Sequence, residues 1–145
     1  MENNERATPT SGARRLYRVM IMDTDGHPTL GRTAACLGVR VLRPSGLVDL
    51  PVHSESLVFP REGGMSVSVD SWRSIHPTFL DRVRDRDTRD RLWCLSETDL
   101  GVKLACRIDP RRPEHGFIEP LDKMTLAEYE EALAFTRLFW TVVPT

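Results

Sequence analysis

The chain has 145 residues, of which 40% are hydrophobic and 28% are charged, which is typical of one globular domain with its own core. We place that domain at residues 14–145. The formal net charge of −1 at pH 7 argues against a general nucleic-acid binder, which normally carries a strongly basic face.

Cys36, Cys94 and Cys106 are widely spaced and form no Cys-x-x-Cys pair, which favours buried free thiols over a disulfide framework or a metal site. No apolar run approaches the ~20 residues of a membrane span, and the N-terminus lacks the apolar segment of a signal peptide. The sequence therefore predicts a cytoplasmic protein with no membrane association. This is compatible with delivery into another cell without a cleaved signal peptide.

Residues 1–13 are polar and lack a periodic apolar pattern, which predicts a flexible N-terminal tail. Residues 14–23 alternate and predict the first strand, with Arg18 in the same row as Leu16 and Met20. An unpaired buried guanidinium is very costly. Arg18 must therefore either pair with a structural carboxylate or face a ligand cleft.

The segments that follow are short. We expect a turn at residues 25–28, a helical turn at 34–37 and a short strand at 38–41. A chain reversal at residues 44–46 and two extended segments, at 47–52 and 56–59, should follow. Pro51 and Pro60 confine the extended segments to the edges or ends of a sheet.

The glycine pair Gly63–Gly64 leads into an alternating Ser/Val run at residues 65–70, which predicts a turn entering a strand. Alternation places Ser66 and Ser68 on one face and the valines on the other. Glycine allows the backbone to approach a ligand closely, so the serine face of this strand, next to the glycine pair, is suited to hold a nucleotide or sugar. The alternative is a hairpin turn with solvent-facing serines.

The second half alternates strands with short helical elements. We expect a surface helix or ordered loop at residues 77–91, a strand at 92–95 and a capped helical turn at 96–101. A strand at residues 103–108, a polar loop at 110–115 and a short strand at 115–120 should follow. Thr125 and Glu128 form a capping-box pattern at the start of a helix that runs to Trp140, with Phe135 and Phe139 beside its apolar side. Many short strands before one strong helix predict an α+β domain.

Two polar residues lie on the last predicted strand. His115 could donate or accept a hydrogen bond with a ribose or phosphate, or it could simply end a loop. Glu119 could stabilise a developing positive charge, or it could be a structural acid at the end of the strand. The sequence contains no P-loop, Gly-x-Gly-x-x-Gly, Gly-x-Ser-x-Gly or His-Glu-x-x-His pattern, so it gives no support for an NTPase, Rossmann enzyme, α/β-hydrolase or zincin.

Four short segments, in this order and spacing, resemble the bacterial type VI secretion effector-two toxin family, which itself resembles ADP-ribosyltransferases. They are Leu16-Tyr17-Arg18, residues 37–40 (LGVR), residues 60–67 (PREGGMSV), and residues 115–120 (HGFIEP) followed by Met124. The resemblance runs from Leu16 to the end of the C-terminal helix. It implies a single compact ADP-ribosyltransferase-like domain of two small packed sheets with a C-terminal helix, holding NAD in the cleft between the sheets.

The resemblance also implies which residues contact NAD. Arg18 fits the first-strand arginine that binds NAD phosphate or ribose, which suits its fixed fork of donors, and Tyr17 is beside it. Ser66 and Ser68 match the Ser-x-Ser strand that shapes the nicotinamide pocket, and Gly64 precedes them.

The catalytic group implied by the resemblance is Glu119 or His115. Glu119 is the available carboxylate for an oxocarbenium-like transition state, whereas His115 matches the toxin family better. Residues 117–119 lack the Glu-x-Glu or Gln-x-Glu pair, which argues against transfer to a protein arginine. The hypothesis is an NAD-using toxin with a neutralising immunity or antitoxin protein, transferring ADP-ribose to protein, nucleic acid or water. The alternative is a non-catalytic binding domain of the same fold that acts through protein contacts.

Overall fold

A computed structural model describes residues 13–41 and 48–144. The predicted tail, except for Ala13, and the predicted reversal at residues 44–46 lie outside the described residues. In the part of the chain that is described, none of the helices has the length and apolarity needed to cross a membrane.

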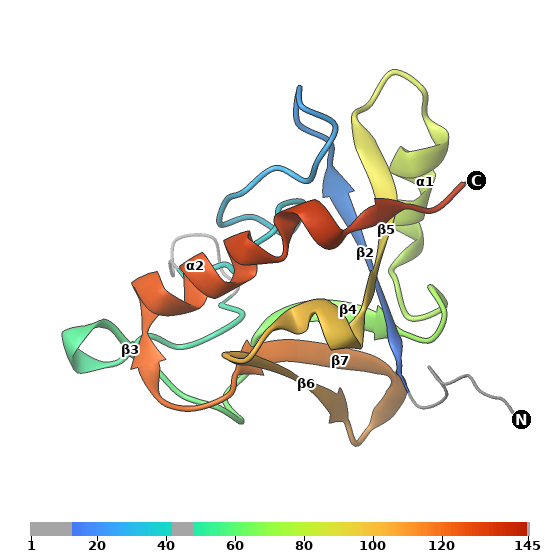
Figure 1. Cartoon of the computed structure of the whole chain (residues 1–145). Coiled ribbons are helices and arrows are strands. Elements are labelled where there is room, and N and C mark those ends of the chain that lie inside the picture. Colours follow the sequence, from blue (N-terminus) through green and yellow to red (C-terminus); the bar gives the residue numbers. More distant parts are fainter. Residues whose placement is uncertain (1–12, 42–47, 145) are drawn as a thin grey trace, which may run out of the picture.

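The predicted α+β class is confirmed, with one six-stranded antiparallel sheet and one two-stranded sheet among the described residues (Figure 1). The large sheet has the order β6-β7-β4-β2-β5-β9, and β3 pairs with β8 in the small one. The strands are β2 (Arg15–Ile21), β3 (Leu57–Val58), β4 (Met65–Val69), β5 (Asp90–Ser96), β6 (Leu104–Asp109), β7 (Arg112–Pro120), β8 (Met124–Thr125) and β9 (Thr141–Val142). The α-helices are α1 (Pro77–Arg84) and α2 (Leu126–Phe135), and the 3-10 helices are η2 (Ser54–Ser56), η3 (Glu97–Leu100) and η4 (Arg137–Phe139).

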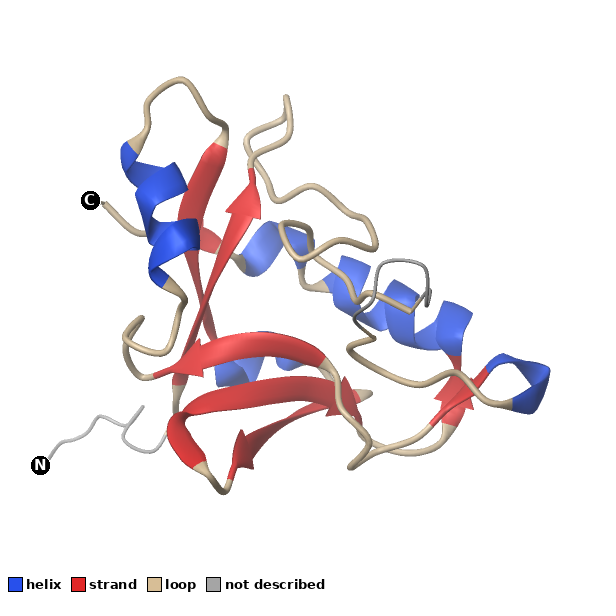
Figure 2. Ribbon diagram, turned by 180° about the vertical axis from the view of Figure 1, so that it is seen from behind, coloured by secondary structure: helices blue, strands red, loops and turns tan. Residues whose placement is uncertain are grey.

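The large sheet opens between β2 and β4. These strands share only two residue pairs, Leu16 with Val69 and Tyr17 with Ser68, whereas β2 pairs with β5 along its whole length. Beyond Tyr17, β2 continues with β5, and β4 continues with β7. Figures 1 and 2 show β2 and β5 running across the direction of β4, β7 and β6. The divergence leaves a gap in which the Arg18 side chain lies.

The helices cover opposite faces of β2 and β5. Alternation along β2 places Tyr17 and Val19 against α1, where they pack with Leu92 and three apolar side chains of the helix: Phe79, Leu80 and Val83. Leu16 and Met20 face the other way, into the main core. That core also holds Trp93, Met65, Ile118, and Tyr129 and Leu133 of α2. The predicted two-sided pattern of the first strand is thus confirmed.

Local sequence patterns explain where the helices begin and end. Pro77 is at the first position of α1, and His76 caps it by accepting a hydrogen bond from the Thr78 amide. The predicted capping box of α2 is present. The helix ends at Phe135 rather than at Trp140, because the Thr136 hydroxyl donates to the Leu133 carbonyl and competes with helical bonding.

Several local features differ from the predictions. Phe135 and Phe139 do not accompany the apolar side of the last helix, since they are 72% and 46% exposed. Residues 34–41 contain one hydrogen-bonded turn, closed by the Cys36 amide on the Thr33 carbonyl, but no strand, because their other backbone groups bond to the end of β2, to the preceding loop and to Asp49. The polar loop at 110–115 is shorter than expected, because β7 begins at Arg112. The edge strand β9 was not predicted.

Candidate functional site

A cleft of about 620 Å³ lies where β2 and β4 diverge. It is bounded by β2, by the polar face of β4 and β7, and by the segment that leads into α1. Its lining comprises Tyr17, Arg18, Val19, Ala34, Arg40, Ser66, Val67, Ser68, Ser74, Ile75, His76, Phe79, Arg112 and His115. The cleft therefore joins segments that are far apart in the sequence.

Five of the seven predicted site residues line this cleft: Tyr17, Arg18, Ser66, Ser68 and His115. Strand register explains part of this convergence. Tyr17 of β2 is opposite Ser68 of β4, and Ser68 is opposite His115 of β7, so the three residues form a row across three neighbouring strands. Residues directly opposite in adjacent strands point to the same face of a sheet.

The other two predicted residues do not line the cleft. Gly64 lies at the approach of β4 to β7, where an added Cβ would be 2.4 Å from the Ile118 carbonyl oxygen. Glu119 is 7% exposed, and its Oε1 accepts hydrogen bonds from the Arg61 amide at 2.8 Å and from Nε of Arg107 at 2.9 Å. The glutamate is therefore already held by an ion pair and a backbone donor.

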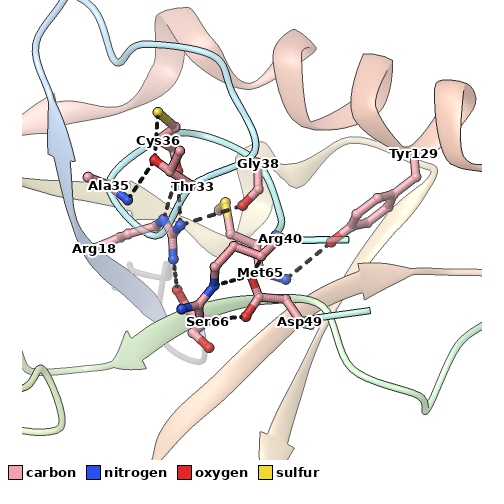
Figure 3. Close-up of polar contacts among 10 residues, drawn as sticks. All are labelled: Arg18, Thr33, Ala35, Cys36, Gly38, Arg40, Asp49, Met65, Ser66 and Tyr129. Carbon is pink, nitrogen blue, oxygen red and sulfur yellow. Dashed lines mark hydrogen bonds and ion pairs between the residues drawn. The ribbon is translucent and has the colours of Figure 1, made fainter. Parts of the chain in front are cut away.

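Arg18 is buried without a carboxylate on its guanidinium (Figure 3). It is 8% exposed; Nε and Nη2 donate to the Cys36 carbonyl at 3.2 and 2.9 Å, and Nη1 donates to the Ser66 carbonyl at 2.8 Å. Nη2 also lies 3.5 Å from the Gly38 carbonyl. A guanidinium has five N–H groups, so one hydrogen on Nη1 has no partner among the described residues.

Burial lowers the pKa of Arg18 to about 10, against the attraction of Asp49. The Asp49 carboxylate is itself engaged by Arg40, whose Nε and Nη2 donate to it at 3.0 and 2.8 Å. The Arg40 amide also donates to the same carboxylate at 2.7 Å. Because the nearby anion is bound in this way, backbone carbonyls are the direct partners that the described part of the chain offers to the charge of Arg18.

The two predicted serines differ in their contacts. Ser68 Oγ accepts from Ser74 Oγ at 2.8 Å and from the Ser74 amide at 3.2 Å, and it lies 3.3 Å from the Glu114 carbonyl. Ser68 therefore fastens the segment before α1 to the sheet. Ser66 Oγ makes no hydrogen bond to the described residues and lies in the cleft wall. Ser66 is thus the serine whose hydroxyl is available to a ligand.

His115 combines burial with two charged neighbours. Its side chain is 15% exposed, and its Nδ1 lies 3.6 Å from Oδ2 of Asp109. Burial lowers the pKa of His115, and the positive charge of Arg112 lowers it further, whereas Asp109 opposes both effects. The lowered pKa favours the neutral imidazole, and a neutral ring has one nitrogen that accepts a hydrogen bond.

Comparison of the chain with protein-family models, curated proteins and solved structures finds no match.

The charge of the cleft indicates what kind of ligand it suits. Its lining includes three arginines and two histidines, and none of the lining residues is an Asp or Glu. Elsewhere too, residues 13–41 and 48–144 contain no cluster of three or more His, Cys, Asp or Glu side chains arranged to hold a metal ion. The cleft is therefore suited to an anion. Sequence reasoning assigned no site role to Arg40 or Arg112, although Arg40 lies within residues 37–40, which it singled out, and Arg112 lies within the predicted polar loop.

Proposed function

We propose that the cleft binds NAD, and that the protein cleaves the nicotinamide–ribose bond and transfers ADP-ribose to a macromolecule or to water. The observation that carries this proposal is the convergence of Tyr17, Arg18, Ser66, Ser68 and His115 on one cleft. They are residues to which the sequence resemblance gives roles in binding NAD or in its chemistry. The same resemblance leads us to propose a toxin with a neutralising immunity protein as its partner.

The chemistry of the cleft supports a dinucleotide as ligand. Arg112 is suited to phosphate, because a guanidinium presents a planar fork of donors to phosphate oxygens, and Arg18 can add one N–H group of Nη1. Val19, Ile75 and Phe79 supply an apolar wall against which a nicotinamide or adenine ring can pack. The volume of about 620 Å³ lies within the range of about 300–1,000 Å³ that is usual for ligand pockets.

His115 is better placed than Glu119 for the reacting part of the ligand. His115 lines the cleft, whereas Glu119 lies outside its lining and is bound by Arg107 and the Arg61 amide. We therefore assign the catalytic role to His115 and a structural role to Glu119. Replacing Glu119 by Gln, which removes the charge but keeps an amide oxygen to accept hydrogen bonds, should leave nicotinamide release intact.

One observation favours a second candidate, which is nucleotide binding without turnover. Cleavage of the glycosidic bond passes through a developing positive charge on the ribose, which a nearby anion stabilises. The lining of the cleft contains no carboxylate. Under this alternative the same cleft binds the nucleotide, and the protein acts through contacts with other proteins.

The test compares adjacent arginines. Arg112 and Arg111 are both exposed, but only Arg112 lines the cleft. A charge-assisted hydrogen bond contributes about 1.5–3 kcal/mol, so Arg112→Ala should weaken NAD binding by about tenfold or more, while Arg111→Ala should not. Calorimetric titration with NAD measures this, and release of labelled nicotinamide measures turnover.

Each outcome of this test decides between the candidates. NAD binding with nicotinamide release supports the enzyme, and binding without release under any condition, including added cell lysate, supports the second candidate. Absence of NAD binding by the wild-type protein would refute both. Equal loss of affinity in Arg111→Ala and Arg112→Ala would show that binding is not in this cleft. Loss of release in a folded Glu119→Gln variant would overturn the assignment of His115.

A further inference from the structure

The end of β6 directs a carboxylate toward the cleft histidine. The pairing of β6 with β7 shifts register between Ile108 and Asp109, and such irregularities change the direction in which a side chain points. Oδ1 of Asp109 accepts a hydrogen bond from the Arg111 amide at 2.9 Å. That bond fixes the carboxylate and leaves Oδ2 at 3.6 Å from Nδ1 of His115.

The ring of His115 is also fixed by packing. Phe117 meets the imidazole edge to face, with ring centroids 4.9 Å apart and planes at 88°. Nδ1 is buried and has no hydrogen-bond partner among the described residues, so Asp109 is its nearest opposite charge. His115 lines the cleft, and Nδ1 is the ring nitrogen that is buried. With Nδ1 close to Asp109, Nε2 is the nitrogen left for a ligand.

We propose that Asp109 is a positioning residue that holds the hydrogen of His115 on Nδ1, so that Nε2 acts as the general base of the cleft. A movement of a few tenths of an ångström would bring the 3.6 Å contact into hydrogen-bond range, and such bonds often tighten when substrate binds. The proposal rests on the proposed function and adds the identity of the base and of the group that orients it.

The reaction step balances without any further reagent. The nucleophile is water or the O–H or N–H group of an acceptor. Its lone pair forms the new bond to C1 of the ribose as the C–N bond breaks, and the electron pair of that bond leaves with neutral nicotinamide. The proton of the nucleophile passes to Nε2 of His115 and then to solvent. General bases of this kind contribute about 10²- to 10⁴-fold to rate.

The charges around His115 keep it in the form that a base requires. Arg112 of β7 favours the neutral ring, and Arg18 and Arg40 are further cations in the lining of the same cleft, which also includes the His76 side chain. Asp109 is the carboxylate that acts against them. Burial and the positive charge of Arg112 thus hold the pKa of His115 below its ordinary value, while Asp109 selects which nitrogen carries the hydrogen.

The test replaces Asp109 by Asn in the full-length protein. The Asn side-chain oxygen can still accept from the Arg111 amide, so its NH₂ group is presented to Nδ1 in place of Oδ2. Nδ1 must then accept, which places the hydrogen on Nε2 and removes the base. Asp122→Asn is the matched control, since it makes the same change in charge at an exposed position outside the cleft.

Two measurements are needed. In the first, NMR follows the ring protons of His115 against pH; Asp109→Asn should move the titration midpoint downward, and Asp122→Asn should leave it in place. In the second, nicotinamide release is measured against pH at saturating NAD. We expect kcat to fall at least about tenfold in Asp109→Asn, as happens when a carboxylate that orients a catalytic histidine is removed, with a smaller effect on KM.

The outcomes separate this inference from the proposed function. If the wild-type protein releases no nicotinamide, the proposed function fails as an enzyme and the general-base role fails with it, while the NMR titration still reports whether the pair exists. If release occurs but Asp109→Asn matches the Asp122→Asn control in kcat and in His115 titration, the inference is refuted and the proposed function stands. A folded His115→Gln variant with wild-type kcat would also refute it.

Discussion

Replacing Arg18 by methionine separates its contribution to folding from its contribution to binding. Methionine keeps much of the side-chain volume and removes the charge and all donors. We expect Arg18→Met to fold, to lose at most about 3 kcal/mol of stability, and to bind NAD about 10- to 150-fold more weakly. The binding figure corresponds to loss of one charge-assisted hydrogen bond worth about 1.5–3 kcal/mol, which the unpartnered Nη1 hydrogen would make to the ligand.

The stability figure follows from two opposing effects. Burial lowers the pKa of Arg18 to about 10, and a shift of that size means that holding the charge in this site costs about 3 kcal/mol. Removing the charge relieves that cost. The carbonyls of Cys36 and Ser66 then lose their donors, at about 1–3 kcal/mol each. The net change is small compared with a typical domain stability of about 5–15 kcal/mol.

Urea unfolding followed by circular dichroism measures the stability, and calorimetric titration with NAD measures the affinity. Arg14→Met is the control, because Arg14 pairs with Glu97 at a position that does not line the cleft. It should lower stability without changing the affinity for NAD. An unfolded Arg18→Met protein would show that the guanidinium is a structural crosslink. A folded variant with wild-type affinity would show that Arg18 does not contact the ligand.

Three further substitutions test the framework of the site, and urea unfolding midpoints measure each. Gly64→Ala should cost several kcal/mol, because its Cβ would lie 2.4 Å from the Ile118 carbonyl oxygen, whereas Gly26→Ala, which meets no atom within 4 Å, should cost about 1–2 kcal/mol for its positive φ. Equal midpoints would refute this. Tyr129→Phe should cost about 1–3 kcal/mol, because it removes a buried hydroxyl that donates to Ile118; an unchanged midpoint would mean that water replaces the bond. Thr125→Ala should cost about 1 kcal/mol by removing the cap of α2, and a neutral effect would contradict the capping box.

The sequence predicted those elements whose pattern is local. Period-2 alternation in β2 and β4 indicated which face each side chain occupies, because both faces of β2 and the valine face of β4 pack in a core, while the serine face of β4 lines the cleft. The Thr125 capping box likewise needs only four residues. The strand β9 has two residues and exists because it pairs with β5, so no periodic pattern could reveal it.

The candidate site was predictable only in part. The polar Arg18 in an apolar row indicated a special environment, and the paired serines indicated a polar face. The partners of Arg18 are backbone carbonyls of Cys36 and Ser66, which every residue type provides, so nothing in the sequence could identify them. The contribution of Arg112 depends on the early start of β7, which the pattern of residues 110–115 did not reveal.

The distribution of carboxylates around the cleft explains why an anion from outside suits Arg18. Asp49 is bound by Arg40, and Glu119 is bound by Arg107, so neither is available to the buried guanidinium. A structural ion pair at Arg18 would have removed the cost of its buried charge, and the chain instead leaves that charge beside an opening lined by further cations. Such an arrangement lowers stability in the absence of ligand. Under the proposed function, the phosphates of NAD supply the missing negative charge. Because binding an anion offsets the free-energy cost of burying the Arg18 charge, the cleft favours anionic ligands over neutral ones.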